Sequence, residues 1–197
     1  MNANDSTRIS KYLSYILRHG AVKEGYNMDP HGFICTDEII SKCIKHTITF
    51  KKIKNIVDTN DKKRFELVEK NNKWYIRAVQ GHSISEINLD LGLHLVKDPS
   101  EIPIVVHGTT IEAYKLIKQT GINRMSRNHI HFAHGTPDDK SVISGMRKTS
   151  EVMVYIDVPK AMDAGIKFYK SSNGVILSEG INGIISPTFF LKVKTIK

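Results

Sequence analysis

The sequence predicts an α+β fold of two lobes, with helices and one hairpin in the first half and mostly short strands in the second. Apolar residues at helical spacing recur before residue 60, and two alternating runs follow at residues 64–68 and 73–77. Two prolines interrupt regular structure within residues 97–103, where we expect the boundary between the lobes. The predicted lobes are therefore residues 1–96 and 97–197.

Three helices are expected in the first lobe, each after a side chain that can cap the first turn. They are residues 8–17 after Ser6 or Thr7 and ending before Gly20, a helix from residue 37 after Thr36, and residues 50–57 after Thr49. The alternating runs flank Asn71-Asn72, which predicts a β-hairpin. Three helices and a terminal hairpin are the composition of a winged-helix module, a nucleic-acid-binding relative of the helix-turn-helix. Many small α+β domains share it.

The second lobe is expected to be mostly β. A buried strand at residues 104–106 leads to His107, and a helix capped by Thr110 ends near Gly121. Further strands are expected at residues 129–132, 152–158, 175–177, 183–185 and 189–193.

Charge indicates the class of partner. The 197 residues include 29 Lys and Arg against 20 Asp and Glu, which gives a formal net charge of +9. Such a field attracts polyanions, and nucleic acid is the leading candidate. A lysine-rich solvated surface without a specific partner is the alternative that charge alone leaves open.

Compartment and membrane association follow from the cysteines and the apolar runs. Cys35 and Cys43 have neither CxxC spacing nor a neighbouring His pair, so we expect reduced thiols in an intracellular protein, cytoplasmic or nuclear. The N-terminal sequence has no leader pattern, and no apolar run is long enough to cross a bilayer. Secretion and membrane insertion are not expected.

Four short clusters carry the candidate chemistry by placing Arg or His beside Gly or another small residue. They are residues 17–20, 77–83, 107–109 and 144–147. Guanidinium forks and closely approaching backbone suit anionic oxygens. The sequence has no metal-ligand spacing and no Gly-rich nucleotide loop. The clusters therefore predict phosphate chemistry without a metal.

Six segments in order carry a family resemblance. They are LSYILRH at residues 13–19, RAVQGHS at 77–83, HGT at 107–109, HIHF at 129–132, GMR at 145–147 and FYKSSNGV at 168–175. Together they resemble the RNA 2'-phosphotransferase family, whose members are also called tRNA 2'-phosphotransferases. The resemblance covers nearly the whole chain.

The resemblance implies both a fold and a reaction. It implies an RNA-binding, winged-helix-like lobe followed by a mostly β, NAD-binding lobe of ADP-ribosyltransferase type. It also implies transfer of the internal 2'-phosphate at a tRNA splice junction to NAD⁺ as co-substrate, without a metal. The products would be 2'-hydroxyl RNA, nicotinamide and ADP-ribose 1'',2''-cyclic phosphate. We expect the partner to be 2'-phosphorylated, spliced tRNA, and the protein to be a monomer.

The resemblance assigns one histidine and three arginines to catalysis. They are Arg18, His19, Arg77 and Arg147. The arginines would hold the phosphate, and His19 would act as general acid or base. Arg127 competes with Arg147 for the last position and is otherwise an anion contact. From the residues alone, His19 could be a helix C-cap and Arg77 a solvated strand residue.

The NAD⁺ contacts implied by the resemblance come from the second lobe. They are His107, Gly108, Thr109, His131, Ser171 and Asn173. Two alternatives stay open: His131 as an ordinary strand histidine, and Ser171 with Asn173 as a polar turn.

The RNA contacts expected outside the catalytic set are Arg127, Lys51 and Lys54, although lysines on a helix more often form only a solvated face. Two other functions remain as alternatives. One is an ADP-ribosyltransferase that leaves ADP-ribose on a nucleic-acid phosphate and does not go on to release a cyclic phosphate. The other is a winged-helix nucleic-acid binder without catalysis.

Overall fold

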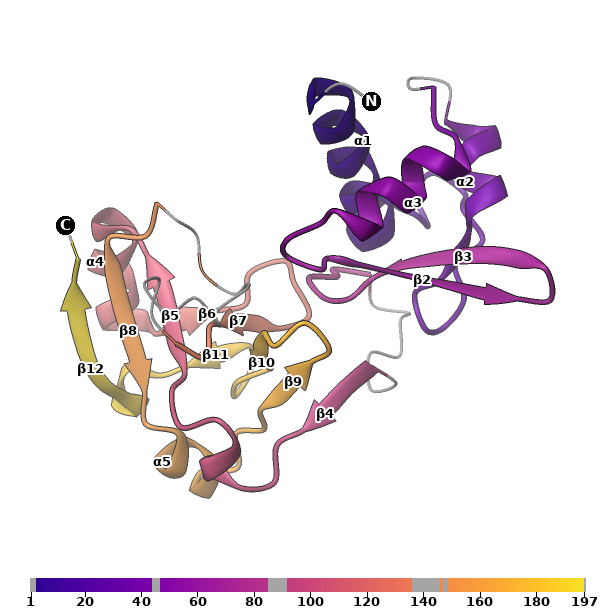
Figure 1. The fold of residues 1–197 in the computed structure, drawn as a ribbon. Coiled ribbons are helices and arrows are strands. Elements are labelled where there is room, and N and C mark those ends of the chain that lie inside the picture. Colours follow the sequence, from indigo (N-terminus) through magenta and orange to yellow (C-terminus); the bar gives the residue numbers. More distant parts are fainter. Residues whose placement is uncertain (1–2, 44–46, 85–91, 136–145, 147–148, 197) are drawn as a thin grey trace. The chain divides into compact units, whose positions relative to one another are not determined.

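The computed structural model describes residues 3–43, 47–84, 92–135, 146 and 149–196. The chain forms two compact units, Met1–Gly92 and Leu93–Lys197 (Figure 1). The sequence had placed a boundary between residues 96 and 97; strand β4 (Leu93–Leu95), which pairs with β9 (Tyr169–Ser171), lies on the second side of the observed division. Helices and strands occur in both units, which confirms the α+β class.

The N-terminal unit packs helices on one small antiparallel sheet. Its helical elements are α1 (Ala3–Tyr15), the π-helical turn η1 (Ile16–Gly20), α2 (Thr36–Lys42) and α3 (Phe50–Asp58). Its strands are β1 (Ile34–Cys35), β2 (Phe65–Lys70) and β3 (Lys73–Ala78), in the order β1-β3-β2.

The predicted hairpin is confirmed. Asn71 and Asn72 both have positive φ, 52° and 58°, which is the backbone that a two-residue hairpin turn of type I′ requires. The turn fixes the register, which pairs Glu66 with Arg77 and Phe65 with Ala78. Strand β1, which was not predicted as a strand, adds to the other edge of β3.

The apolar stripe of α1 builds the core of this unit. Ile9 and Leu13 from α1 and Ile16 and Leu17 from η1 are fully buried with Ile53 of α3. Each such burial contributes about 1.5–3 kcal/mol. The stripe therefore fixes where the helix ends, and with it where the next residues project.

Helix starts were predicted with mixed success. Helix α1 begins at Ala3, so Ser6 and Thr7 lie inside it and their predicted capping role is wrong. Thr36 is the buried first residue of α2 rather than its cap. Thr49 does cap α3, accepting the Lys52 amide at 3.3 Å.

The C-terminal unit is built mainly from short strands. Its remaining strands are β5 (Val106–Thr109), β6 (Ile122–Asn123), β7 (Ile130–Phe132), β8 (Val152–Ile156), β10 (Ile176–Ser178), β11 (Ile184–Ile185) and β12 (Phe190–Thr195). Its helical elements are η3 (Pro99–Glu101), α4 (Ile111–Thr120), α5 (Val158–Asp163) and η4 (Pro187–Phe189). The sheets have the orders β4-β9-β10-β7, β12-β8-β5 and β11-β6, and Figure 1 shows β8 between β5 and β12.

Three details of this unit differ from the sequence prediction. Strand β5 starts at Val106 rather than residue 104, and Ile104 is 42% exposed. Strand β8 stops at Ile156 because Asp157 caps α5, which the prediction had taken as more strand. Strands β4, β6 and β9 were not predicted. Helix α4 agrees, with Thr110 as N-cap and Gly121 as C-cap.

Two sheets of the C-terminal unit meet next to the predicted NAD⁺ residues. The amides of Val106 and Ala133 each donate to the other residue's carbonyl at 2.9 Å. These bonds join the start of β5 to the end of β7. His107 on β5 and His131 on β7 are thereby brought side by side.

Candidate active site

Arg18 and His19 lie in the π-helical turn that ends α1. The Ala21 amide donates to the Ile16 carbonyl at 3.1 Å, five residues back. Gly20 closes the turn against the Tyr15 ring, where a Cβ would come within 2.6 Å of a ring carbon. Turns of this kind occur often at functional sites.

The segment after β3 packs against these two residues. His19 Nδ1 and Ser83 Oγ form a hydrogen bond of 2.8 Å, and the Ser83 amide donates to the Arg18 carbonyl at 2.9 Å. Gly81 has a φ of 91°, and a Cβ there would meet Arg18 Nε at 3.4 Å. Two of the four predicted clusters, residues 17–20 and 77–83, therefore meet within one unit. Their contacts set the backbone position of Arg18 and the ring orientation of His19.

Arg77, on β3, contacts β2 and the segment that precedes β1. Its Nε donates to Glu66 Oε2 at 2.7 Å, Nη2 lies 2.6 Å from the same oxygen, and Nη1 donates to the His31 carbonyl at 3.3 Å. The guanidinium also stacks 4.6 Å from the centre of the Phe33 ring. Three of its five N–H donors are therefore engaged within the protein.

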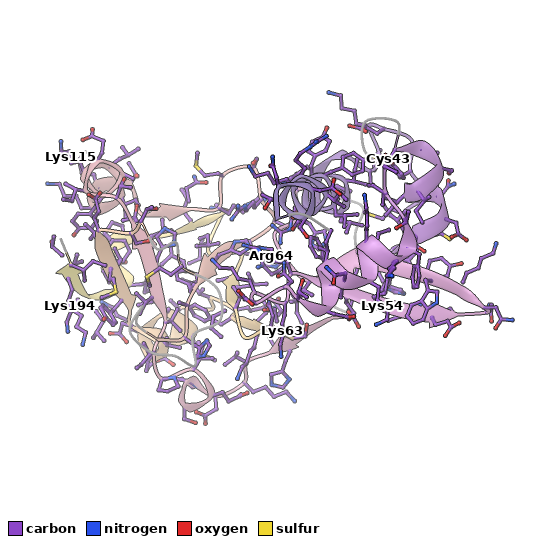
Figure 2. The ribbon with its side chains drawn as sticks, turned by 45° about the horizontal axis from the view of Figure 1, so that its top comes forward. Cys43, Lys54, Lys63, Arg64, Lys115 and Lys194 are labelled. Carbon is purple, nitrogen blue, oxygen red and sulfur yellow. The ribbon has the colours of Figure 1, made fainter. Side chains whose placement is uncertain are left out.

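The two lysines predicted to contact RNA lie on α3 and are exposed. Lys54 pairs with Asp58 at 2.9 Å, one turn further on, an arrangement typical of a solvated helix face. Figure 2 labels Lys54 on this helix. The neighbouring Lys52 pairs with Asp5 at 2.9 Å.

A cavity of about 500 Å³ in the C-terminal unit gathers three predicted ligand contacts. His107, His131 and Arg127 line it, with apolar side chains from α4 such as Leu116 and Ile117. The volume is in the range of small-molecule sites; the apolar walls suit aromatic rings, and the cationic Arg127 suits an anionic linker. The residues present fit a dinucleotide.

His107 is held as a neutral imidazole. Its Nδ1–H donates to the His131 carbonyl at 3.1 Å, and its ring meets Phe132 edge-on at 5.9 Å. Burial lowers the pKa of His107, and the bond to the carbonyl offsets only part of that effect. At neutral pH the Nε2 atom is therefore a hydrogen-bond acceptor.

Gly108 and Thr109 follow His107 on β5, and their contacts fix the backbone of that strand. A Cβ on Gly108 would collide with the Met146 side chain and come within 2.6 Å of Ser150 Oγ, so a larger residue requires these side chains to move. The Thr109 carbonyl accepts from the Glu151 amide at 2.8 Å.

Ser171 and Asn173 form a buried turn between β9 and β10. Ser171 Oγ lies 2.8 Å from Asn173 Oδ1 and 3.0 Å from the Val175 carbonyl, and it also accepts from the Val175 amide at 3.0 Å. Each of the two is 4% exposed. The Ser171 hydroxyl is therefore used within the turn.

Of the two arginines that compete for the last catalytic position, the structure describes Arg127 and not Arg147. Arg127 lines the cavity beside His107 and His131, and its carbonyl accepts from Arg124 Nη1 at 2.7 Å. Arg147 lies outside the described residues. Its neighbour Met146 packs with Val106, Met153 and Tyr155.

Sequence reasoning missed several residues at these sites. Glu66 could have been found, because the two-residue turn at Asn71-Asn72 places it opposite Arg77. His134, whose Nδ1 lies 3.0 Å from the Gly174 carbonyl, had no local signal, since that contact joins segments 40 residues apart.

Two searches concern metals and membranes. Within the part of the chain that the structure describes, no group of three or more His, Cys, Asp or Glu side chains is placed to bind a metal ion. Among the same residues, no helix combines the length and apolar character needed to span a bilayer.

Comparison with known proteins gives one family over both units. The sequence profile described as "RNA 2'-phosphotransferase, Tpt1 / KptA family" matches residues 4–180. A Schizosaccharomyces pombe protein is 43% identical over 192 residues, 98% of this chain and 52% of that protein. The Danio rerio "tRNA 2'-phosphotransferase 1" is 39% identical over 100% of this chain and 90% of its own. The Saccharomyces cerevisiae "tRNA 2'-phosphotransferase" is 38% identical over 88% and 79%.

The chain thus spans about half the length of the S. pombe relative and nine tenths of the zebrafish one. The match runs from α1 to just past β10, so it includes the Arg18–His19 turn and the His107 cavity alike. The resemblance inferred from the six motifs is confirmed. The chain belongs to the RNA 2'-phosphotransferase family.

Proposed function

We propose that this chain removes the internal 2'-phosphate at a tRNA splice junction by transferring it to NAD⁺. The products are 2'-hydroxyl RNA, nicotinamide and ADP-ribose 1'',2''-cyclic phosphate. The observation that carries the proposal is the family match across both units, supported by relatives that bear the name of this activity.

The finer fold assignments belong to the same proposal. The order α1, β1, α2, α3, β2, β3 supports a winged-helix-like, RNA-binding N-terminal unit. The strand-rich C-terminal unit is the ADP-ribosyltransferase-like, NAD-binding part. We further propose a monomer that acts in the cytoplasm or nucleus on spliced tRNA.

Phosphate binding falls to the arginines. Arg18 presents its guanidinium beside the backbone of Gly81, where a phosphate could meet both. Arg77 can donate its two remaining N–H groups to the phosphate, because Glu66 and His31 engage the other three, and Glu66 positions the guanidinium. Arg147 remains assigned by the resemblance, and Arg127 is its rival. Removing one well-placed charged donor should cost about 3–4 kcal/mol of transition-state stabilisation.

Proton transfer falls to His19. Release of the RNA 2'-oxygen requires a proton, and closure of the cyclic phosphate requires that a ribose hydroxyl lose one. The bond between His19 Nδ1 and Ser83 orients the ring, so that Nε2 performs the exchange. NAD⁺, when bound, supplies both the nicotinamide leaving group and the ribose that accepts the phosphate.

NAD⁺ binding falls to the C-terminal unit. Neutral His107 offers Nε2 as an acceptor for a ribose hydroxyl, while His131 and Arg127 line the same cavity. Gly108 and Thr109 hold the backbone of β5 in place. Ser171 contributes by fixing the turn that presents Asn173.

The test is conversion of a short RNA with one internal 2'-phosphate in the presence of NAD⁺, followed by mass analysis of all products. We expect His19→Ala to keep RNA affinity and to lose turnover by about 10²- to 10⁴-fold. The matched control is His94→Ala, on an exposed histidine that pairs with Glu101. RNA that gains ADP-ribose would indicate the alternative transferase, and unchanged RNA without nicotinamide release would refute the proposal.

A further inference from the structure

A second hollow, in the N-terminal unit, lies outside the candidate active site. It measures about 490 Å³ and runs along one face of α1. Ser10, Lys11 and Ser14 form one wall, and Thr59, Asn60 and Arg64 are on the opposite side. We call this the α1 groove. Its lining is rich in hydroxyl and amide groups and contains no carboxylate.

Two cations of the α1 groove differ from four others in this unit. Lys42, Lys52, Lys54 and Arg77 are each paired with a carboxylate. Among the described residues, by contrast, the side chains of Lys11 and Arg64 have no hydrogen-bond or ion-pair partner. In Figure 2, Arg64 lies beside α1 and α3. The groove therefore offers two positive charges that no carboxylate of the described residues pairs with.

Both walls of the groove lead to the Arg18–His19 turn. On α1, Lys11 and Ser14 lie three residues apart, which keeps them on one face, and the helix leads directly into the turn that holds Arg18. On the other wall, the Arg64 carbonyl accepts from the Val79 amide at 2.9 Å. Val79 begins the segment that ends at Ser83, the partner of His19.

We infer that the α1 groove binds the phosphodiester backbone of the RNA beside the nucleotide that carries the 2'-phosphate. The inference rests on the proposed function, because it places substrate next to the reacting phosphate. Lysine, arginine, serine and amide donors are the groups that hold nucleic-acid backbones without reading sequence. The groove therefore contributes affinity and register but not base specificity.

Lys11 gives the cleanest test because it is exposed on a helix and its replacement leaves no buried group unpaired. We compare Lys11→Glu with Lys118→Glu, an equal change of charge on the exposed face of α4 that does not line either hollow. Binding is measured by fluorescence anisotropy with a single-stranded RNA that lacks any 2'-phosphate, over a series of salt concentrations. Circular dichroism melts confirm that both variants fold.

Lys11→Glu should weaken RNA binding about fivefold or more and reduce the salt slope by about 0.7, the value for one phosphate contact on a single strand. Lys118→Glu should change binding much less and keep the slope. Arg64→Gln should weaken binding in the same way as Lys11→Glu. In turnover, Lys11→Glu should raise the KM for RNA and leave the KM for NAD⁺ unchanged.

Three outcomes would overturn the inference. Equal losses in Lys11→Glu and Lys118→Glu would mean that only net charge matters. Unchanged RNA affinity in Lys11→Glu would mean that the groove does not hold the backbone. A rise in the KM for NAD⁺ alone would assign the groove to the dinucleotide. Failure of the proposed function is separate, because RNA binding is measured without NAD⁺ and without a 2'-phosphate.

Discussion

Ser83→Ala removes the hydroxyl that orients the His19 ring while leaving the Ser83 amide bonded to the Arg18 carbonyl. One hydrogen bond of this kind contributes about 0.5–1.5 kcal/mol, which corresponds to a loss of about 2- to 12-fold in kcat. RNA affinity should not change, because the hydroxyl acts through His19. Single-turnover rates with saturating NAD⁺ and 2'-phosphorylated RNA measure the effect.

A double-mutant cycle separates this positioning role from a general loss of structure. His19→Ala alone should cost about 10²- to 10⁴-fold, and adding Ser83→Ala should cost nothing more, since the group that it orients is gone. Ser41→Ala, which removes an exposed hydroxyl bonded to the Glu38 carbonyl, is the matched control. Wild-type rates in Ser83→Ala, or losses that simply multiply in the double variant, would refute the reasoning.

Four further predictions concern stability and NAD⁺ binding. Gly108→Ala should destabilise the C-terminal unit by about 1–3 kcal/mol in urea unfolding, because the added Cβ collides with the Met146 side chain. Adding Met146→Ala to the same protein should restore part of that loss, and no recovery would contradict this explanation. Because burial holds the pKa of His107 below 6.5, its stability contribution is complete above that pH and is lost as pH falls through the folded pKa. His107→Asn should therefore flatten the acid side of the stability profile, and an unchanged profile would contradict this. Thr49→Ala should lower the free energy of unfolding by about 1 kcal/mol in thermal unfolding, and Thr49→Ser should lower it by less than half as much. Equal stability of the two variants would mean that the Thr49 hydroxyl does not stabilise the helix. Arg127→Ala should raise the KM for NAD⁺ more than the KM for RNA, and the reverse result would move Arg127 to the RNA side.

Local signals predicted the elements that depend on local chemistry. Thr49 and Thr110 mark two helix starts, and Asn71-Asn72 marks the hairpin, because each motif satisfies nearby backbone groups or adopts the backbone that the turn requires. The same logic was available for Asp157 followed by a proline in the first turn of α5, and it was overlooked in favour of a longer strand.

Elements that depend on distant partners could not be predicted. Strands β4 and β6 have three and two residues, too few for an alternating pattern, and each pairs only with a strand distant in the sequence. Strand β9, also three residues long, pairs with β4 as well as with its near neighbour β10. The π-helical turn at Ile16–Gly20 is equally hidden, since one extra residue in a turn leaves the apolar stripe of α1 almost unchanged.

The candidate site shows the same division. The motifs identified Arg18, His19 and His107 as residues with a chemical role, but they did not predict which residues these side chains contact. The contact of His19 with Ser83 spans 64 residues, and that of His107 with the His131 carbonyl spans 24. The partner of Arg77 was the exception, because hairpin register alone places Glu66 opposite it.

The stoichiometry of a single turnover tests the central claim most directly, namely that His19 and the arginines move one phosphate from RNA to NAD⁺. With enzyme in excess over an RNA bearing one internal 2'-phosphate, the account predicts one nicotinamide and one ADP-ribose cyclic phosphate for each phosphate lost, and formation of the cyclic phosphate at least about 10²-fold slower in His19→Ala. Nicotinamide release by the wild-type protein from an RNA that keeps its phosphate, or cyclic phosphate formed at the wild-type rate by His19→Ala, would contradict it.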